Sequence, residues 1–127
     1  MKTQYTVALA LLAGVAIGGV AIQGLHAQAK PPVYYIGEND VTNADAYAKE
    51  YLPRAMELIK ANGGRYIAAG KATTLEGEPP KARIVVLAFD SMDKIRAWRN
   101  SPEYKEHRKI GDKYAKFRSY AIEGVSQ

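Results

Sequence analysis

The order of hydrophobic and polar positions predicts a strand and then a long helix at the start of the folded region. Residues 33–41 begin with four consecutive β-favouring residues and are expected to form a strand. The next segment places its apolar residues on one arc of a helical wheel, with Lys and Glu residues on the opposite side. These apolar positions are Ala44, Tyr47, Ala48, Tyr51, Leu52, Ala55, Leu58 and Ile59. They predict a strongly amphipathic helix.

Local signals place the two ends of this helix and a break inside it. Thr42 fits an N-cap, with Asp45 in the first turn. Pro53 lies on the solvent side of the wheel, where an interior proline removes a backbone hydrogen bond and clashes with the preceding turn. We therefore expect either a kink at Pro53 or two abutting helices. The glycines at 63–64 are expected to end the helix, because glycine readily adopts the left-handed cap conformation.

The rest of the chain predicts three further strands and two more helices. In chain order these are a strand over 65–76, a turn over 77–81, a strand over 83–89, a helix starting within 90–93, a helix starting at 101–102 and a strand over 117–125. Ser101 is expected to cap the last helix, with Pro102 in its first turn. The order β-α-β-β-α-β predicts a ferredoxin-like α+β fold, an antiparallel sheet with helices on one face.

Two of the predicted strands are too apolar for a sheet with one face in water. A half-exposed antiparallel strand alternates apolar and polar residues. Residues 84–89 are apolar throughout, and Tyr34 and Tyr35, which point to opposite faces, are followed by Ile36. One chain has helices for only one face. We therefore predict a symmetric homodimer in which two sheets pack face to face.

The N-terminal segment, residues 1–29, has the pattern of a secretory signal peptide. Lys2 is its only charged residue, and an apolar core rich in small residues follows over 7–22. That core is 16 residues long, short of the roughly 20 that a membrane-spanning helix needs. Several glycines weaken it further as a stable membrane helix.

An A-x-A cleavage signal ends this segment and defines the mature chain. Cleavage is expected after Ala29, with a cut after Ala27 as the alternative. Retention of the segment as an uncleaved membrane anchor is the competing interpretation, and contact with a membrane is expected only in that case. Cleavage predicts an exported, periplasmic protein made of one domain, residues 30–127.

Composition excludes several classes of function. The chain has no cysteine, so disulfides, thiolate nucleophiles and cysteine metal sites are absent. One of the 18 basic residues is Lys2, which leaves 17 basic and 13 acidic residues, interleaved, after residue 29. Without a recognised binding motif, and with an export signal, nucleic-acid binding is not expected. A single histidine after residue 29 argues against a zinc-type site or haem, so no metal and no cofactor is predicted.

Several short stretches together resemble one protein family. They are Tyr35, Val41-Thr42, Gly63-Gly64-Arg65, Glu76-Gly77, Phe89, Trp98, Ser101-Pro102-Glu103-Tyr104 and Glu123-Gly124-Val125. Their order and spacing over residues 33–125 resemble the domain-of-unknown-function 1330 family, within the dimeric α/β-barrel superfamily. The resemblance implies a ferredoxin-like dimer and no established reaction. The chain departs from the common pattern in its export signal and in Tyr35, where tryptophan is frequent.

The candidate chemistry lies on the inward arc of the last helix. The wheel places Tyr104, His107 and Arg108 on this arc, with four lysines on the other side. An imidazole there is a candidate general base near neutral pH, and Arg108 a candidate partner for a ligand carboxylate. The alternative is structural, because an inward histidine more often forms one hydrogen bond and packs.

Three further residues complete the candidate site. Tyr35 and Trp98 are candidates for lining a pocket between sheet and helices, although Trp98 also fits a packing stripe with neighbours at helical spacing. Glu76, at the end of the predicted second strand, is a candidate proton acceptor if it turns inward. Its alternatives are a solvated turn residue or an ion-pair partner for Arg83.

Two functional hypotheses follow from these candidates. The first is an exported dimer that binds a small apolar or aromatic molecule between sheet and helices, with or without cofactor-free catalysis. The second is a non-catalytic envelope interaction or stress-related domain, whose inward polar residues only support the fold. The ligand is not specified by either one.

Overall fold

The computed structural model describes residues 30–80 and 82–127. The predicted signal peptide lies outside these residues. Within the described residues, one compact unit extends from Pro31 to the C-terminus. No helix in this part of the chain is long and apolar enough to span a membrane.

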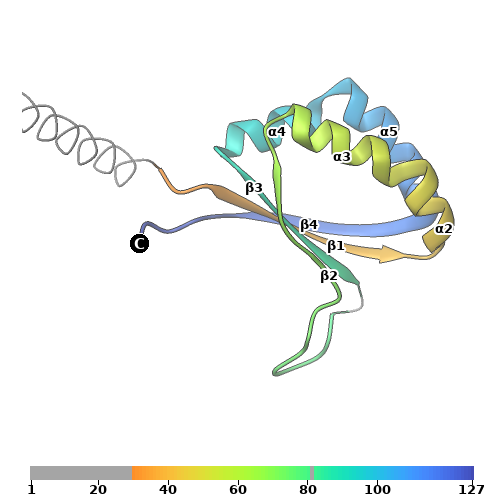
Figure 1. Cartoon of the computed structure of the whole chain (residues 1–127), viewed down its shortest axis with the longest axis horizontal. Coiled ribbons are helices and arrows are strands. Elements are labelled where there is room, and N and C mark those ends of the chain that lie inside the picture. Colours follow the sequence, from red (N-terminus) through yellow and green to blue (C-terminus); the bar gives the residue numbers. More distant parts are fainter. Residues whose placement is uncertain (1–29, 81) are drawn as a thin grey trace, which may run out of the picture. The chain divides into compact units, whose positions relative to one another are not determined.

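Four antiparallel strands form the sheet, and the helices cover one of its faces (Figure 1). The elements are β1 (Val33–Val41), α2 (Ala44–Ala46), η1 (Tyr47–Tyr51), α3 (Leu52–Ala61), β2 (Arg65–Gly70), β3 (Arg83–Phe89), α4 (Met92–Asn100), α5 (Pro102–Tyr114) and β4 (Ala115–Glu123). The strand order is β2-β3-β1-β4. The predicted ferredoxin-like α+β fold is therefore confirmed.

The first helical segment is continuous from Ala44 to Ala61, and it changes from a π-helical turn to an α-helix just before Pro53. A π-helical turn, η1, ends at Tyr51, and α3 then begins with Pro53 in its first turn. A proline is tolerated there because that N–H has no partner within the helix. Tyr47 and Tyr51, the first and last residues of the π-helical turn, are buried on the side that faces the sheet and α5.

The prediction that Thr42 caps this helix was wrong. Asn43 is the N-cap, and its Oδ1 accepts a hydrogen bond of 3.2 Å from the Ala46 N–H. Thr42 instead donates its hydroxyl to the Tyr114 carbonyl at 3.0 Å, which ties the end of β1 to the end of α5. The N-cap is therefore one residue later than predicted, because the Thr42 hydroxyl donates to a carbonyl that is distant in sequence.

The second strand is shorter than predicted. It ends at Gly70, which pairs with Ile84, the second residue of β3. Beyond this pair, β3 has only its first residue, Arg83, to offer as a partner. Without a partner strand, residues 71–80 form a loop that includes Gly77 at φ +79° and two prolines. The last strand is β4, which begins at Ala115 rather than 117, because it pairs with the whole of β1.

The outer sheet face is the face of the sheet opposite the helices. Register and strand alternation place seven apolar residues there: Tyr34, Ile36, Ile84, Val86, Ala88, Tyr120 and Ile122. Tyr120 and Ile122 are 48% and 62% exposed. Ala88 is buried, and the ion pair of Glu38 with Arg118 lies at the end of this face next to the loop between β2 and β3. The remaining part of the face is an apolar surface on a single protomer.

Candidate functional site

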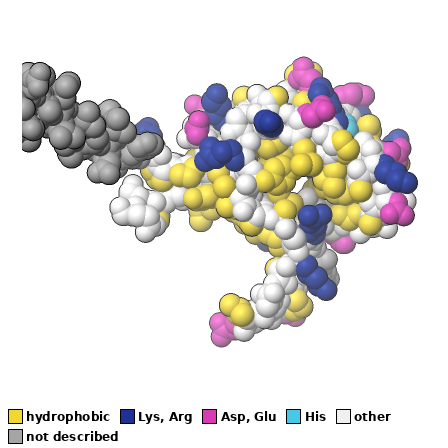
Figure 2. Space-filling view, viewed as in Figure 1, with side chains coloured by type: hydrophobic (Ala, Val, Ile, Leu, Met, Phe, Trp, Pro, Cys, Tyr) yellow, Lys and Arg dark blue, Asp and Glu magenta, His cyan; other side chains and the backbone are white. Residues whose placement is uncertain are grey.

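A cavity of about 230 Å³ lies between the helices and the sheet. Its walls are Tyr35, Gly37, Asn39, Tyr47, Tyr51, Leu52, Ala55, Met56, Leu58, Ile59, Tyr66, Ala69, Arg83, Val85, Trp98, Tyr104, His107, Arg108 and Phe117. Figure 2 shows a hollow below the helices, where hydrophobic side chains gather and basic side chains lie at the edge. The walls are mainly aromatic and aliphatic, so the cavity is suited to an organic molecule.

Trp98 is the centre of the aromatic wall. Its ring stacks on Phe89 at 5.4 Å and meets Tyr35 and Tyr104 edge-on at 5.0 and 5.1 Å between centroids. It is only 4% exposed, and its indole Nε1 has no hydrogen-bond partner in the described part of the chain. The side chain both packs in the core and borders the cavity.

Two tyrosine hydroxyls in the cavity wall accept hydrogen bonds from arginines. Arg99 Nη1 donates to Tyr35 Oη at 2.8 Å, and Arg108 Nη1 donates to Tyr104 Oη at 2.7 Å. Burial raises the pKa of the Tyr104 phenol, and the two nearby guanidinium groups oppose that rise. Within the described residues neither hydroxyl donates to another group. Arg108 lines the cavity, so the Tyr104 hydroxyl lies beside a residue of the cavity wall, whereas Arg99, the partner of Tyr35, borders a separate hollow with Ser119.

Arg108 is held by three contacts at the wall of the cavity. Its Nε donates to Asp112 Oδ1 at 2.9 Å, and its guanidinium lies 4.0 Å from the centroid of the Phe117 ring. Together with the bond to Tyr104, these contacts fix its position. Its charge already has a carboxylate partner, which reduces its capacity to bind a second anion.

His107 borders the cavity through a stacked and hydrogen-bonded arrangement with Tyr51. Its ring lies 4.9 Å from the Tyr51 ring at an angle of 6°, and its Nε2 is 2.7 Å from the Tyr51 carbonyl oxygen. Because a carbonyl only accepts, Nε2 carries the proton and donates. The neutral imidazole then has Nδ1 as its remaining acceptor.

A glycine in α5 makes the close approach of Tyr51 feasible. A Cβ on Gly111 would lie 2.6 Å from Tyr51 Cε1, closer than real Cβ contacts. Burial raises the pKa of the Tyr51 phenol well above its ordinary value, so this hydroxyl stays protonated at neutral pH. Gly111 thus has a packing role, since any larger residue there would displace the Tyr51 ring.

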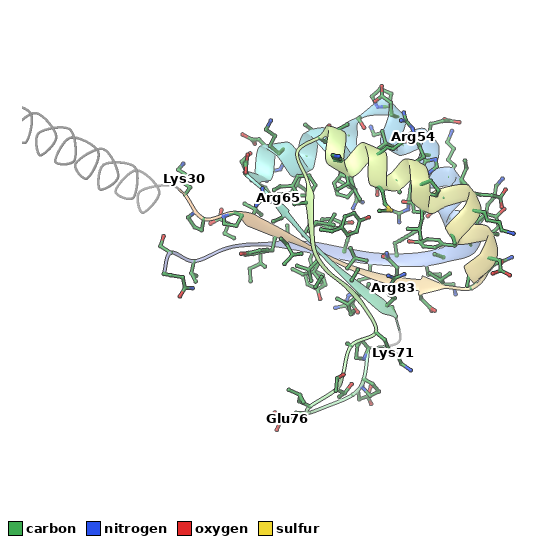
Figure 3. All side chains as sticks on the ribbon, in the orientation of Figure 1. Lys30, Arg54, Arg65, Lys71, Glu76 and Arg83 are labelled. Carbon is green, nitrogen blue, oxygen red and sulfur yellow. The ribbon has the colours of Figure 1, made fainter. Side chains whose placement is uncertain are left out.

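The structure does not bring Glu76 to the other candidates. Figure 3 places it at the end of the loop between β2 and β3, away from the helices. It is exposed, as is the neighbouring Leu75 at 94%, and it does not line the cavity. The other five candidates, Tyr35, Trp98, Tyr104, His107 and Arg108, all line it.

Several cavity residues were not predicted as site residues. Tyr47 and Tyr51 were assigned only to the buried face of a helix. Asn39, whose Nδ2 donates to Tyr47 Oη at 3.3 Å, and Arg83 carried no signal apart from strand position. Strand alternation, which puts Asn39 on the same face as Tyr35, was the one available indication.

The described residues include no group of three His, Asp or Glu side chains that could hold a metal ion. The cavity instead offers tyrosine hydroxyls, arginine guanidinium groups and aromatic rings. Groups of these kinds are suited to stacking and hydrogen bonding with an organic molecule. Fold and cavity together define a ferredoxin-like α+β domain with an aromatic pocket between its sheet and helices.

The chain belongs to the family described as Domain of unknown function (DUF1330), whose model matches residues 32–125. The predicted family resemblance is therefore confirmed. No curated protein matches the sequence. The family assignment agrees with the fold and carries no reaction with it.

Solved structures of other proteins share the fold at low sequence identity. A protein of unknown function from Rhodopseudomonas palustris has a TM-score of 0.62 at 15% identity, over 77% of this chain and 85% of its own. SnoaB, a cofactor-independent oxygenase from Streptomyces nogalater, has a TM-score of 0.57 at 10% identity, over 76% and 96%. An Arabidopsis thaliana protein has a TM-score of 0.56 at 16% identity, over 78% and 93%. At these identities the similarity shows the fold alone.

Proposed function

We propose that this protein binds a small, mainly aromatic molecule in the cavity between its sheet and helices. One observation carries the proposal: a cavity of about 230 Å³ has walls formed mainly by aromatic and aliphatic side chains. A benzene molecule fits an apolar cavity of about 150 Å³. The volume here suits a molecule of one or two rings.

Binding is expected to stabilise the protein against heat. We expect 2-naphthol to raise the melting temperature with increasing concentration, because a ligand at a hundredfold its Kd adds about 2.7 kcal/mol to the stability of the native state. Ala55 lines the cavity, so Ala55→Phe is expected to fill it and abolish the shift. Ala61→Phe, at an exposed position on the same helix that does not line the cavity, is the matched control.

Three outcomes of this experiment separate the candidate functions. A shift that Ala55→Phe removes and Ala61→Phe retains supports the pocket. A shift that survives in Ala55→Phe places binding elsewhere and contradicts the proposal. No shift with any one- or two-ring aromatic compound favours the alternative, a non-catalytic envelope interaction or stress-related domain.

Cofactor-free turnover of the bound molecule is a second candidate. It is supported by His107, an imidazole that borders the cavity, and by the cofactor-independent oxygenase with the same fold. Dioxygen would be the oxidant in such a reaction, and the bound molecule would supply the electrons. In the same titration, loss of 2-naphthol under air but not under nitrogen, abolished by His107→Ala, would establish turnover. Complete recovery in both atmospheres would leave a binding protein.

We also propose that two copies associate through the outer sheet face. Six of the seven apolar residues on that face, all except Ala88, are at least partly exposed in one protomer, and a second copy would remove this apolar surface from water. A domain of about 100 residues buries a modest fraction of its surface, so a second copy adds useful burial.

Export to the periplasm rests on the composition of residues 1–29. We expect the protein expressed in a Gram-negative host to appear in the periplasmic fraction with Lys30 as its first residue, or Gln28 for the alternative cut. Intact-mass spectrometry checks this result. A mass that includes Met1 in the membrane fraction would support the uncleaved anchor instead.

A further inference from the structure

The cavity wall has an unbalanced charge. Its lining includes Arg83, Arg108 and His107 and no Asp or Glu. Guanidinium groups remain charged at all physiological pH values, so the wall is positive whatever the state of the imidazole. A cavity of this kind favours a negatively charged occupant, because its low-polarity walls strengthen electrostatic interactions.

Of the two arginines, Arg83 is the one without a carboxylate. Arg108 is paired with Asp112 at 2.9 Å, whereas no ion pair within residues 30–80 and 82–127 includes Arg83. Arg83 begins β3 opposite Asn39, and strand alternation turns both residues toward the helices. The guanidinium therefore lies at the cavity with its charge uncompensated.

Burial distinguishes the two ends of the cavity. Arg83 is exposed, which places it at the opening, whereas Leu58, Ile59 and Trp98 at the inner wall are at most 7% exposed. Tyr66 lies near Arg83: burial raises the pKa of its phenol, and the Arg83 guanidinium opposes that rise. An occupant would have its apolar rings inside and its charged group at the opening.

We infer that the molecule bound in this cavity is an aromatic anion, with its rings against Trp98 and its acidic group on Arg83. The inference rests on the proposed binding function and adds the class of ligand to it. Arginine suits this role because its planar fork matches a carboxylate and forms two parallel hydrogen bonds.

Two probes of the same shape test the charge. 2-Naphthoate is an anion at pH 7, and 2-naphthamide is its neutral counterpart. By isothermal titration calorimetry we expect naphthoate to bind the wild type about tenfold more tightly than naphthamide, as one charge-assisted hydrogen-bond pair provides. Arg83→Gln is expected to remove this preference, because it weakens naphthoate binding about tenfold more than naphthamide binding. Arg83→Lys, which keeps the positive charge, is expected to retain part of the preference for naphthoate.

Arg65→Gln is the matched control. Arg65 lies on the neighbouring strand β2, pairs with Asp90 at 3.6 Å and does not line the cavity, so its loss changes net charge without changing the site. Two results would overturn the inference and leave aromatic binding intact. One is equal affinity of the wild type for the two probes, and the other is a loss of the naphthoate preference in Arg65→Gln as large as that in Arg83→Gln. Absence of binding by both probes at millimolar concentration would overturn the proposed function and this inference together.

Discussion

Replacement of Trp98 by Ala is expected to lower the free energy of unfolding by about 3–5 kcal/mol, the usual cost of removing a buried large aromatic side chain. Trp98 is 4% exposed and contacts Phe89, Tyr35 and Tyr104 through their rings. A domain is typically stable by only about 5–15 kcal/mol. The substitution would therefore remove a large fraction of the stability.

Trp98→Phe separates packing from the indole N–H. Phenylalanine keeps an aromatic ring among the same neighbours and removes a buried donor that has no partner in the described residues. An unsatisfied buried donor costs about 1–3 kcal/mol, which offsets part of the lost ring area. We expect a net loss of about 1 kcal/mol.

Urea unfolding of both variants, at a fixed protomer concentration, checks these values. The concentration must be fixed because dissociation of a dimer contributes to its apparent stability. A loss below about 1 kcal/mol in Trp98→Ala would contradict the packing role. A Trp98→Phe protein of near wild-type stability that no longer binds 2-naphthol would show that the indole itself contacts the ligand.

Replacement of Val86 by Glu is expected to convert the proposed dimer into a monomer, with half the mass by light scattering. Val86 lies on β3 and pairs with Ile36 on β1, near the centre of the outer sheet face. Burial of a carboxylate without a partner costs several kcal/mol. A symmetric interface contains the substituted residue twice, so this cost is doubled.

The control for this substitution is Ala97→Glu, which introduces the same charge at an exposed position on α4. It is expected to leave the mass unchanged. A wild-type protein that is monomeric at micromolar concentration, or a Val86→Glu protein that remains dimeric, would contradict association through this face. Retained helical circular dichroism would show that the variant is folded.

The local features of the helices were predictable because their causes are local. Ser101 accepts a hydrogen bond from the Tyr104 N–H, and Pro102 starts α5, as the sequence indicated. Gly63 has φ +87° at the end of α3. Each depends on a few consecutive residues, so neighbouring residue types were sufficient to specify it.

The predictions that were wrong concern places where a segment distant in sequence determines the local structure. The Thr42 hydroxyl donates to the Tyr114 carbonyl, and Asn43 is the N-cap instead. The strand expected to reach Glu76 ends at Gly70, because β3 offers no partner beyond that point. Glu76, which was predicted to lie beside the site, therefore lies in an exposed loop.

The sequence by itself determined the order of the elements, the family and the inward arc of α5, because apolar periodicity and capping act over short distances. Only the tertiary structure decided which inward residues border a cavity. It brought Arg83 and Asn39 opposite each other on paired strands and placed the Tyr51 carbonyl against His107 across 56 positions of sequence. Such contacts depend on strand register and on how helices pack over the sheet, which no short stretch of residues specifies.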